Sequence, residues 1–343
     1  MKIGTIGYAN NSGLGVMLKF FRKHLEIDSQ LVIRWEAKGT NLNDLKICNF
    51  TITSKEHPSK TSLEEFIGFG LDVVLIIEYP FCWDYLKILK EKGIKIVYIP
   101  MIDSVGTKIL EKYKDFVDLW FCVNKWSYNI IKAKGWKCCY LPYPIDTDYF
   151  KFIQRGENKV LLHNAGYVGL KNRKGTDLVL RAFQKLDKEK VKLIINSQVP
   201  LEKYGCLYDV DLRVGEKLEI MDLYKEGDIY LAPSRFEGNG LTMYEAMACG
   251  FPVITTNAPP MNEVVEDKEF LIKVENNLHF NEENTIYEPD LNDFVSKINF
   301  VMDIDLKEVS KRNREIIENK FSWNVLKSQY LDIFYKIVNK EVL

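Results

Sequence analysis

Residues 233–250 have the sequence PSRFEGNGLTMYEAMACG, which places two glutamates, Glu237 and Glu245, eight positions apart. The apolar run 229–232 before this stretch predicts a short buried strand. Residues 241–248 predict a helix that ends at a glycine. Glu237 is therefore expected in a glycine-bearing loop after a strand, and Glu245 about one turn inside the following helix.

The start of this predicted helix suits a particular kind of ligand. Backbone N–H groups at a helix start attract anions, above all phosphate. A carboxylate beside an anion site repels phosphate, so its expected partners are hydroxyl groups. Phosphate together with hydroxyl groups describes a nucleotide sugar. The alternative is that both glutamates are ordinary surface carboxylates around a strand–helix turn.

The same stretch resembles the E-x7-E signature of the retaining glycosyltransferases of family four, the glycosyl transferases group 1. The continuation 252–256 and then Glu263 are similar to the strand and acidic loop that follow the motif in that family. The resemblance implies an α/β chain with the GT-B fold. In that fold two Rossmann-like domains face a central cleft, and a C-terminal helix crosses back to the first domain.

The resemblance also implies roles for residues of the motif. Glu237 is expected to bind hydroxyl groups of the donor sugar near the reacting carbon, and Glu245 the ribose diol, because carboxylates are acceptors for hydroxyl donors. Arg213 and Val214 lie in a segment similar to the family's base-facing loop. Four consecutive backbone N–H groups are expected to hold phosphate oxygens, those of Gly238, Asn239, Gly240 and Leu241.

A basic run at 169–175, GLKNRKG, is similar to the family's R-K-G segment. A fixed cation there would offset the charge that develops on a leaving diphosphate. Lys174 is the first choice for that role and Arg173 the second, and a solvated basic loop is the alternative. The family usually has an arginine directly after the glycine that closes the preceding strand, but Tyr167 occupies that position. Arg173 or Lys171 is a candidate replacement.

The first half of the chain matches the family less closely. The loop after its first strand contains Gly13 and Gly15 and resembles the family's first glycine loop, which covers the donor diphosphate and sugar. Many relatives have a histidine followed by an acid after the fourth strand, whereas this chain has Pro100 to Asp103 without the histidine. Asp103 either contacts sugar or acceptor, or caps the next helix, and the cap is the preferred interpretation.

Strands and helices alternate along the chain, which predicts parallel sheets covered by helices. With 343 residues, about two domains are expected. We predict an acceptor-side domain at 1–145, a linker across 142–157, a nucleotide-sugar domain at 158–320 and a crossover helix at 321–343. Predicted strands of the first half are Lys2–Ile6, Ser29–Ile33, Val73–Ile77, Lys95–Ile99 and Leu119–Val123. In the second half a helix is predicted near Leu218–Lys225.

Composition excludes several other classes. The formal net charge of −1 provides no basic field of the kind that drives binding to nucleic acid or to anionic membranes. No apolar run reaches the ~20 residues of a membrane span, and the first residues read as a strand rather than a signal peptide. The seven cysteines lack metal-site or disulfide spacing. We therefore expect a cytoplasmic protein without metal or cofactor, as a monomer or weak dimer.

The prediction for function is a retaining, metal-independent hexosyltransferase whose donor substrate is a nucleoside diphosphate sugar, with UDP as the expected nucleotide. The acceptor stays open among glycan, lipid-linked sugar, protein and modified nucleobase. Two other classes also stay open. One is a sugar-nucleotide 2-epimerase on the same fold, and the other is a catalytically silent sugar-nucleotide-binding protein.

Overall fold

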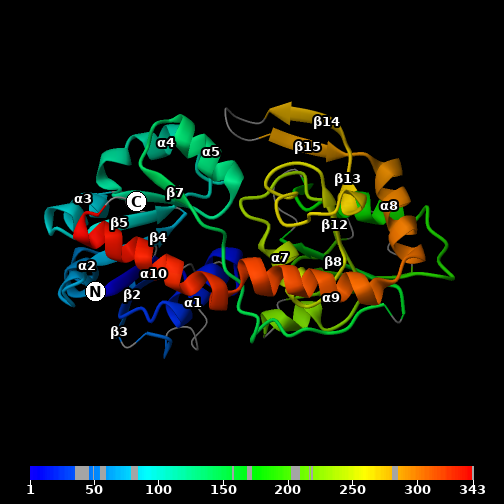
Figure 1. Cartoon of the computed structure of the whole chain (residues 1–343), viewed down its shortest axis with the longest axis horizontal. Helices are drawn as coiled ribbons and strands as arrows, with labels where there is room; N and C mark the ends of the chain where they lie inside the picture. The colour runs from blue at the N-terminus through cyan, green and yellow to red at the C-terminus, as the bar shows by residue number, and fades with distance from the viewer. Residues whose placement is uncertain are drawn as a thin grey trace. The chain divides into compact units, whose positions relative to one another are not determined.

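The computed structural model describes residues 1–34, 46–48, 50–54, 59–78, 84–156, 158–167, 172–201, 209–215, 217, 219–279 and 285–341. The chain forms two compact units (Figure 1). Unit 1 comprises Met1–Pro144 and Trp323–Leu343, and unit 2 comprises Ile145–Ser322. Each unit has its own parallel sheet and its own apolar core.

Unit 1 contains a seven-stranded sheet in the order β3-β2-β1-β4-β5-β6-β7, in which every neighbouring pair is parallel. Its strands are β1 Ile3–Gly7, β2 Ser29–Ile33, β3 Phe50–Ser54, β4 Val73–Ile77, β5 Lys95–Ile99, β6 Leu119–Cys122 and β7 Cys138–Tyr140. Its helices are α1 Gly13–His24, α2 Lys60–Ile67, α3 Asp84–Glu91, α4 Thr107–Glu111, the short 3-10 helix η3 Lys114–Phe116, α5 Lys125–Ala133 and α10 Trp323–Asn339.

Alternate residues of these strands face opposite sides of the sheet, so helices are needed on both. On one side Val74, Ile96 and Trp120 belong to a core that includes residues of α2, α3, α4 and α5. On the other side Phe121 packs edge-on against Tyr330 of α10, with ring centroids 4.8 Å apart. The long C-terminal helix therefore completes unit 1, although 178 residues of unit 2 separate it in sequence.

Aromatic side chains of α10 pack against α1. Phe21 of α1 makes edge-on contacts with Trp323 and Tyr330, at centroid distances of 5.4 Å each. Tyr330 is fully buried, and its hydroxyl donates a hydrogen bond of 2.8 Å to the carbonyl of Pro142. The apolar spacing of the C-terminal segment, which predicts a helix, is confirmed, and Figure 1 shows α10 running across the strands.

Unit 2 contains a six-stranded parallel sheet in the order β10-β9-β8-β11-β12-β13, with a separate antiparallel hairpin β14-β15. Its strands are β8 Val160–Gly166, β9 Lys192–Ser197, β10 Val210–Val214, β11 Ile229–Ala232, β12 Val253–Thr256, β13 Leu271–Ile272, β14 Val274–His279 and β15 Thr285–Pro289. Its helices are α6 Thr176–Phe183, η6 Ile220–Tyr224, α7 Leu241–Ala248, η7 Lys268–Phe270, α8 Leu291–Asp303, α9 Leu306–Ile316 and the π-helical turn η8 Ile317–Phe321.

The sheet of unit 2 is covered by helices that pack in pairs, α6 against α8 and α7 against α9. The order of the strands reverses between β8 and β11, because β9 and β10 lie on one side of β8 and β11 and β12 on the other. In open α/β sheets this reversal creates a crevice at the carboxyl ends of the strands, where ligands bind. The loops after β8 and β11 contain the basic run and Glu237, respectively.

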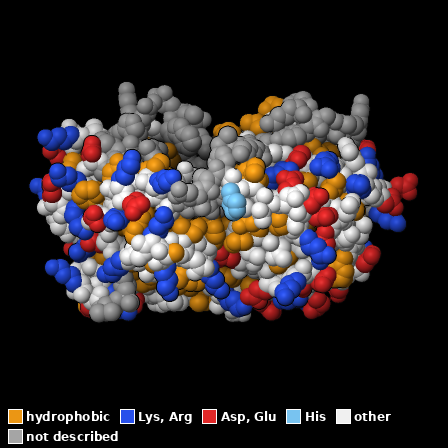
Figure 2. Space-filling model, turned by 90° about the horizontal axis from the view of Figure 1, so that it is seen from above, with side chains coloured by type: hydrophobic (Ala, Val, Ile, Leu, Met, Phe, Trp, Pro, Cys, Tyr) orange, Lys and Arg blue, Asp and Glu red, His pale blue; other side chains and the backbone are white. Residues whose placement is uncertain are grey.

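Two details differ from the sequence-based expectations. The segment predicted as a helix near 218–225 is a 3-10 helix, η6. Residues 145–157, predicted to lie in a linker, belong to unit 2, where Arg155 is 2% exposed and forms part of the packed interior. Lys, Arg, Asp and Glu side chains are interspersed on the face shown in Figure 2, in keeping with the near-zero net charge.

Candidate functional site

The E-x7-E stretch folds as the sequence predicts, with β11, a loop and then α7. Helix α7 starts at Leu241 after Gly240, and it ends where Gly250 adopts a left-handed backbone with φ of 84°. The N–H of Phe251 then donates to the carbonyl of Ala246, which closes the helix end with a Schellman-type bond. In the first turn of α7 the N–H of Met243 donates to the carbonyl of the N-cap residue, Gly240, at 2.9 Å, whereas the N–H groups of Leu241 and Thr242 precede the first bond of the helix ladder, as at every helix start.

Glu237 lies at the centre of a buried ionic cluster. Its Oε1 accepts hydrogen bonds from Lys174 Nζ at 2.6 Å and from Ser234 Oγ at 2.8 Å, and Arg173 Nη1 lies 3.4 Å from its Oε2. The side chain is only 4% exposed. Burial alone would raise the pKa of Glu237, but the charges of Lys174 and Arg173 and the two hydrogen bonds outweigh it and hold the pKa below its ordinary value.

A close backbone contact brings the basic run onto the Glu237 loop. Gly175, at the start of α6, has φ of 69°, and a Cβ atom there would lie 2.1 Å from the carbonyl oxygen of Pro233. Only glycine allows that approach. The N–H of Arg235 also donates to the carbonyl of Arg173 at 2.7 Å. The glycine of the R-K-G-like segment is therefore what allows Lys174 to reach Glu237.

Glu245 is also buried, but its protein partner is a tyrosine. The Tyr224 hydroxyl, at the end of η6, donates a hydrogen bond to Glu245 Oε2. Burial raises the pKa of Glu245 to about 7, although the hydrogen bond from Tyr224 and the charge of Lys174 act to lower it. Lys174 thus lies within electrostatic reach of both glutamates, which brings three of the predicted residues into one cluster.

Sequence reasoning missed Tyr224 and its support, Arg155. The Arg155 guanidinium donates to the carbonyls of Cys249 at 3.1 Å and Gly227 at 2.9 Å and to that of Tyr224, and it stacks on the Phe251 ring at 3.8 Å. It therefore fixes the end of η6 against the end of α7. A basic residue in a segment read as a linker gave no signal of this role.

The other predicted residues of unit 2 lie in varied surroundings. Arg213, near the carboxyl end of β10, pairs with Asp211 and Glu226, each at 2.7 Å, and Val214 beside it is 52% exposed. Asn239 is 4% exposed, between Gly238 and the helix start. Lys171, a candidate replacement for the family's arginine, lies outside the described residues.

His163, in the middle of β8, is a structural residue. Its Nδ1 donates to the carbonyl of Leu231 at 2.8 Å, and its Nε2 accepts from the Thr176 hydroxyl at 3.0 Å. Burial lowers the pKa of this imidazole to about 4, so it is neutral at ordinary pH. With both nitrogens occupied, the ring connects β8, β11 and the start of α6 beneath the ionic cluster.

Three predicted residues belong to unit 1. Gly13 and Gly15 lie in the first turn of α1, whose N-cap is Ser12; its hydroxyl accepts from the Gly15 N–H at 3.3 Å. The preferred interpretation of Asp103 as a helix cap is wrong. Helix α4 begins at Thr107 with Gly106 at its N-cap and no side-chain cap, and Asp103 lies in the turn before it.

Comparison with known proteins identifies the family that unit 2 matches. Residues 161–298 match the family model described as glycosyl transferases group 1. Unit 2 contains a group 1 glycosyltransferase domain. The matched range includes both glutamates, Lys174 and Arg173.

Relatives agree with this assignment over parts of their length. A lipopolysaccharide core biosynthesis mannosyltransferase, LpsB of Rhizobium meliloti, is 48% identical over 59 residues, 17% of each chain. An O-antigen biosynthesis glycosyltransferase of Escherichia coli, WclY, is 34% identical over 115 residues, 31% of this chain and 32% of the relative. The chain thus aligns with less than a third of the length of these two proteins.

The fold of the whole chain resembles that of a solved structure. HepE of Anabaena, crystallised in complex with UDP, superposes with a TM-score of 0.73 at 14% identity, covering 98% of this chain and all of HepE. The chain therefore has the predicted GT-B fold, with two Rossmann-like domains and a C-terminal helix that returns to the first of them.

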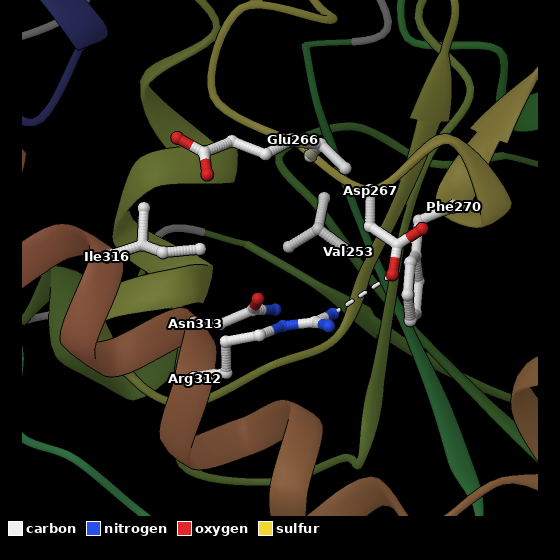
Figure 3. Close-up of a pocket in the computed structure, with 8 residues that line it drawn as sticks. Val253, Glu266, Asp267, Phe270, Arg312, Asn313 and Ile316 are labelled. Carbon is white, nitrogen blue, oxygen red and sulfur yellow. Dashed lines mark hydrogen bonds and ion pairs between the residues drawn. The ribbon is translucent and has the colours of Figure 1, made fainter.

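The group 1 domain also contains a pocket of about 230 Å³ away from the predicted residues. It lies between α9 and the segment after β12, and Figure 3 shows Arg312 reaching across it to Asp267, at 3.2 Å. Glu266, at its edge, pairs with Lys320. The remaining lining residues are Val253, Val265, Phe270, Asn313 and Ile316.

The described residues contain neither a membrane-spanning helix nor a metal-binding cluster. Among them, no helix is both long enough and apolar enough to cross a bilayer. The same residues contain no group of three or more His, Cys, Asp or Glu side chains arranged to hold a metal ion. In the described part of the group 1 domain, the cations beside Glu237 are the side chains of Lys174 and Arg173.

Proposed function

We propose that the chain is a retaining glycosyltransferase that moves a hexosyl group from a UDP-sugar to a hydroxyl acceptor. The observation that carries the proposal is the buried contact of Lys174 and Arg173 with Glu237 beside the start of α7. Two cations, one carboxylate and a row of helix N–H groups suit a ligand with a diphosphate next to a sugar ring. The crystal structure of HepE with UDP supports the choice of nucleotide.

In the proposed reaction the bond between the sugar's anomeric carbon and the diphosphate oxygen breaks, and the electron pair leaves with UDP. Lys174, Arg173 and the N–H groups at Leu241 stabilise the charge that develops on the diphosphate. They supply this stabilisation without a metal ion. Glu237 accepts hydrogen bonds from sugar hydroxyls and so orients the ring.

The acceptor oxygen then bonds to the anomeric carbon from the face that the diphosphate leaves, and a phosphate oxygen takes its proton. This order of events retains the configuration of the sugar. Because the cationic groups are already held in place by the fold, little reorganisation is needed as charge develops. The proposal for retention rests on the resemblance to family four.

The test is to incubate the purified chain with UDP-glucose, UDP-galactose and UDP-N-acetylglucosamine, with and without simple glycoside acceptors, and to measure released UDP. We expect UDP release that increases with an acceptor, and an α-configured product by NMR. Appearance of a 2-epimer of the donor would instead identify an epimerase. Binding of UDP-sugars without turnover across the panel would identify a silent binding protein.

Replacing Tyr224 with phenylalanine tests the proposed ribose contact of Glu245. Ionised Glu245 accepts hydrogen bonds from the ribose diol, so UDP affinity should increase as pH rises through about 7. Without the Tyr224 hydrogen bond, which lowers the pKa of Glu245, this increase should move to higher pH. At pH 7 we expect UDP to bind about fivefold more weakly, the equivalent of one hydrogen bond.

The measurement is calorimetric titration of UDP between pH 6 and 8. Tyr149→Phe is the matched control, because Tyr149 also donates to a glutamate, Glu219, at 2.9 Å in the same unit. An unchanged pH dependence in Tyr224→Phe, together with unchanged affinity, would show that Glu245 does not bind the ribose.

A further inference from the structure

Arg235 precedes Glu237 by two residues and is bound on two sides by carboxylates. Its Nε and Nη2 donate to Glu288 at 2.6 and 2.7 Å, and its Nη1 and Nη2 donate to Asp177 at 2.8 and 2.9 Å. Only 9% of its side chain is exposed. Both pairs are bidentate, the arrangement that most restricts a guanidinium.

The two carboxylates come from different elements. Asp177 is in the first turn of α6, directly after the basic run, and Glu288 is on β15 of the antiparallel hairpin. The N–H of Tyr287 also donates to the carbonyl of Arg235 at 2.9 Å. Arg235 thus connects the hairpin, the start of α6 and the loop that contains Glu237.

Arg235 also holds the main chain of the basic run. Its Nη1 donates to the carbonyl of Asn172 at 3.0 Å, and its own N–H donates to the carbonyl of Arg173 at 2.7 Å. Two consecutive carbonyls next to Lys174 are therefore bound to one residue. The position of Lys174 relative to Glu237 depends on these bonds.

We propose that Arg235 is a positioning residue for the glycosyl transfer, which holds Lys174 and Arg173 against Glu237 through its bonds to Asp177, Glu288 and the basic run. This inference rests on the proposed function. It makes the hairpin β14-β15 a functional part of the group 1 domain, because Glu288 supplies one of the two carboxylates. Because Nε, Nη1 and Nη2 of Arg235 all donate to acceptors within the protein, we expect this residue to touch neither sugar nor diphosphate.

The expected consequence of removing Arg235 follows from geometry. A shift of about 1 Å in a group that stabilises the transition state can cost about 10²-fold in rate. Arg235→Lys keeps the charge but cannot bind two carboxylates bidentately. Asp177 and Glu288 are about a third exposed, so water solvates them when the arginine is gone, and we expect the variants to fold.

The test compares Arg235→Met, Arg235→Lys and Glu288→Gln with the unchanged chain. We expect kcat to fall about 10²-fold in Arg235→Met and less in the other two, with a smaller change in UDP affinity. Arg312→Lys is the control, because Arg312 forms an exposed pair with Asp267 outside the cluster. Its kcat should match that of the unchanged chain.

The pH profile separates positioning from general loss of structure. The groups that face Glu237 are Lys174, Arg173 and Ser234, and the two cations hold its pKa down. When they move away the pKa of Glu237 rises, so the acidic limb of kcat should shift to higher pH in Arg235→Met. An unaltered limb and an unaltered kcat in the folded variant would overturn the inference.

A crystal structure of Arg235→Met provides a readout that does not depend on activity. We expect the basic run to move by about 1 Å or more and the Lys174–Glu237 contact to be lost. If the contact persists unchanged, Arg235 does not position the cations. If the unchanged chain turns over no donor but the contact is lost in the variant, the proposed function fails while the positioning role stands.

Discussion

Glu237→Gln is expected to lower kcat by about 10²- to 10³-fold, or about 3–4 kcal/mol in the activation free energy. The amide has nearly the same shape but carries no charge, so its hydrogen bonds to sugar hydroxyls are weaker. UDP affinity should stay unchanged or increase. In the unchanged chain Lys174 lies 2.6 Å from the Glu237 carboxylate. Because the substitution removes this counter-ion, we expect Lys174 to become more available to the diphosphate.

The measurement pairs steady-state kinetics at saturating donor with calorimetric titration of UDP. Glu266→Gln is the matched control, since Glu266 pairs with Lys320 at an exposed position of the same unit. Equal kcat values for the two variants would show that Glu237 makes no contact with the transferred sugar. A large loss of UDP affinity in Glu237→Gln would place the carboxylate at the nucleotide instead.

Arg155→Met is expected to lower the free energy of unfolding of unit 2 by about 3–5 kcal/mol. Arg155 is 2% exposed, and its guanidinium satisfies three backbone carbonyls at the ends of η6 and α7. Methionine fills the space next to Phe251 but donates no hydrogen bond, so those carbonyls stay buried and unsatisfied. Burial already lowers the pKa of Arg155 to about 10, a measure of how strongly the site is desolvated.

The chain offers an internal reference for this measurement. All six tryptophans lie in unit 1, so tryptophan fluorescence follows that unit, whereas far-UV circular dichroism and calorimetry follow both. We expect an earlier calorimetric transition with little change in the fluorescence transition. Arg312→Met, which removes an exposed ion pair, should cost less than about 1 kcal/mol. Equal effects of the two variants would contradict the proposed role of Arg155.

Much of the fold could be predicted because its signals are local. The strands Ser29–Ile33, Val73–Ile77 and Lys95–Ile99 have the predicted bounds in the structure. Each is a short run of mainly apolar residues, as expected for a strand buried on both faces. Helix α7 was equally predictable, because the residues at its start and the glycine after its end lie in one short stretch of the sequence.

Other elements could not be predicted, because their apolar pattern is weak. Strand β14 of the hairpin contains mostly polar, exposed residues, so no apolar periodicity marks it. Tyr224 was only part of a predicted helix. Its hydroxyl donates a hydrogen bond to Glu245, which lies 21 residues later in the sequence. The preferred cap assignment for Asp103 failed because α4 begins at Thr107, a few residues later than that assignment requires. Helix ends are the part of a helix that is hardest to place.

The sequence by itself predicted the strand–loop–helix unit that contains Glu237, Glu245 and the glycines between them, because motif residues on one such unit are placed by local geometry. The class of ligand inferred from it stays a prediction. Only the tertiary structure decided how the two glutamates differ. Glu237 is held below its ordinary pKa by cations from a loop 63 residues away, and Glu245 is held above it by burial beside Tyr224. Such differences arise from contacts between distant segments, which no local pattern encodes.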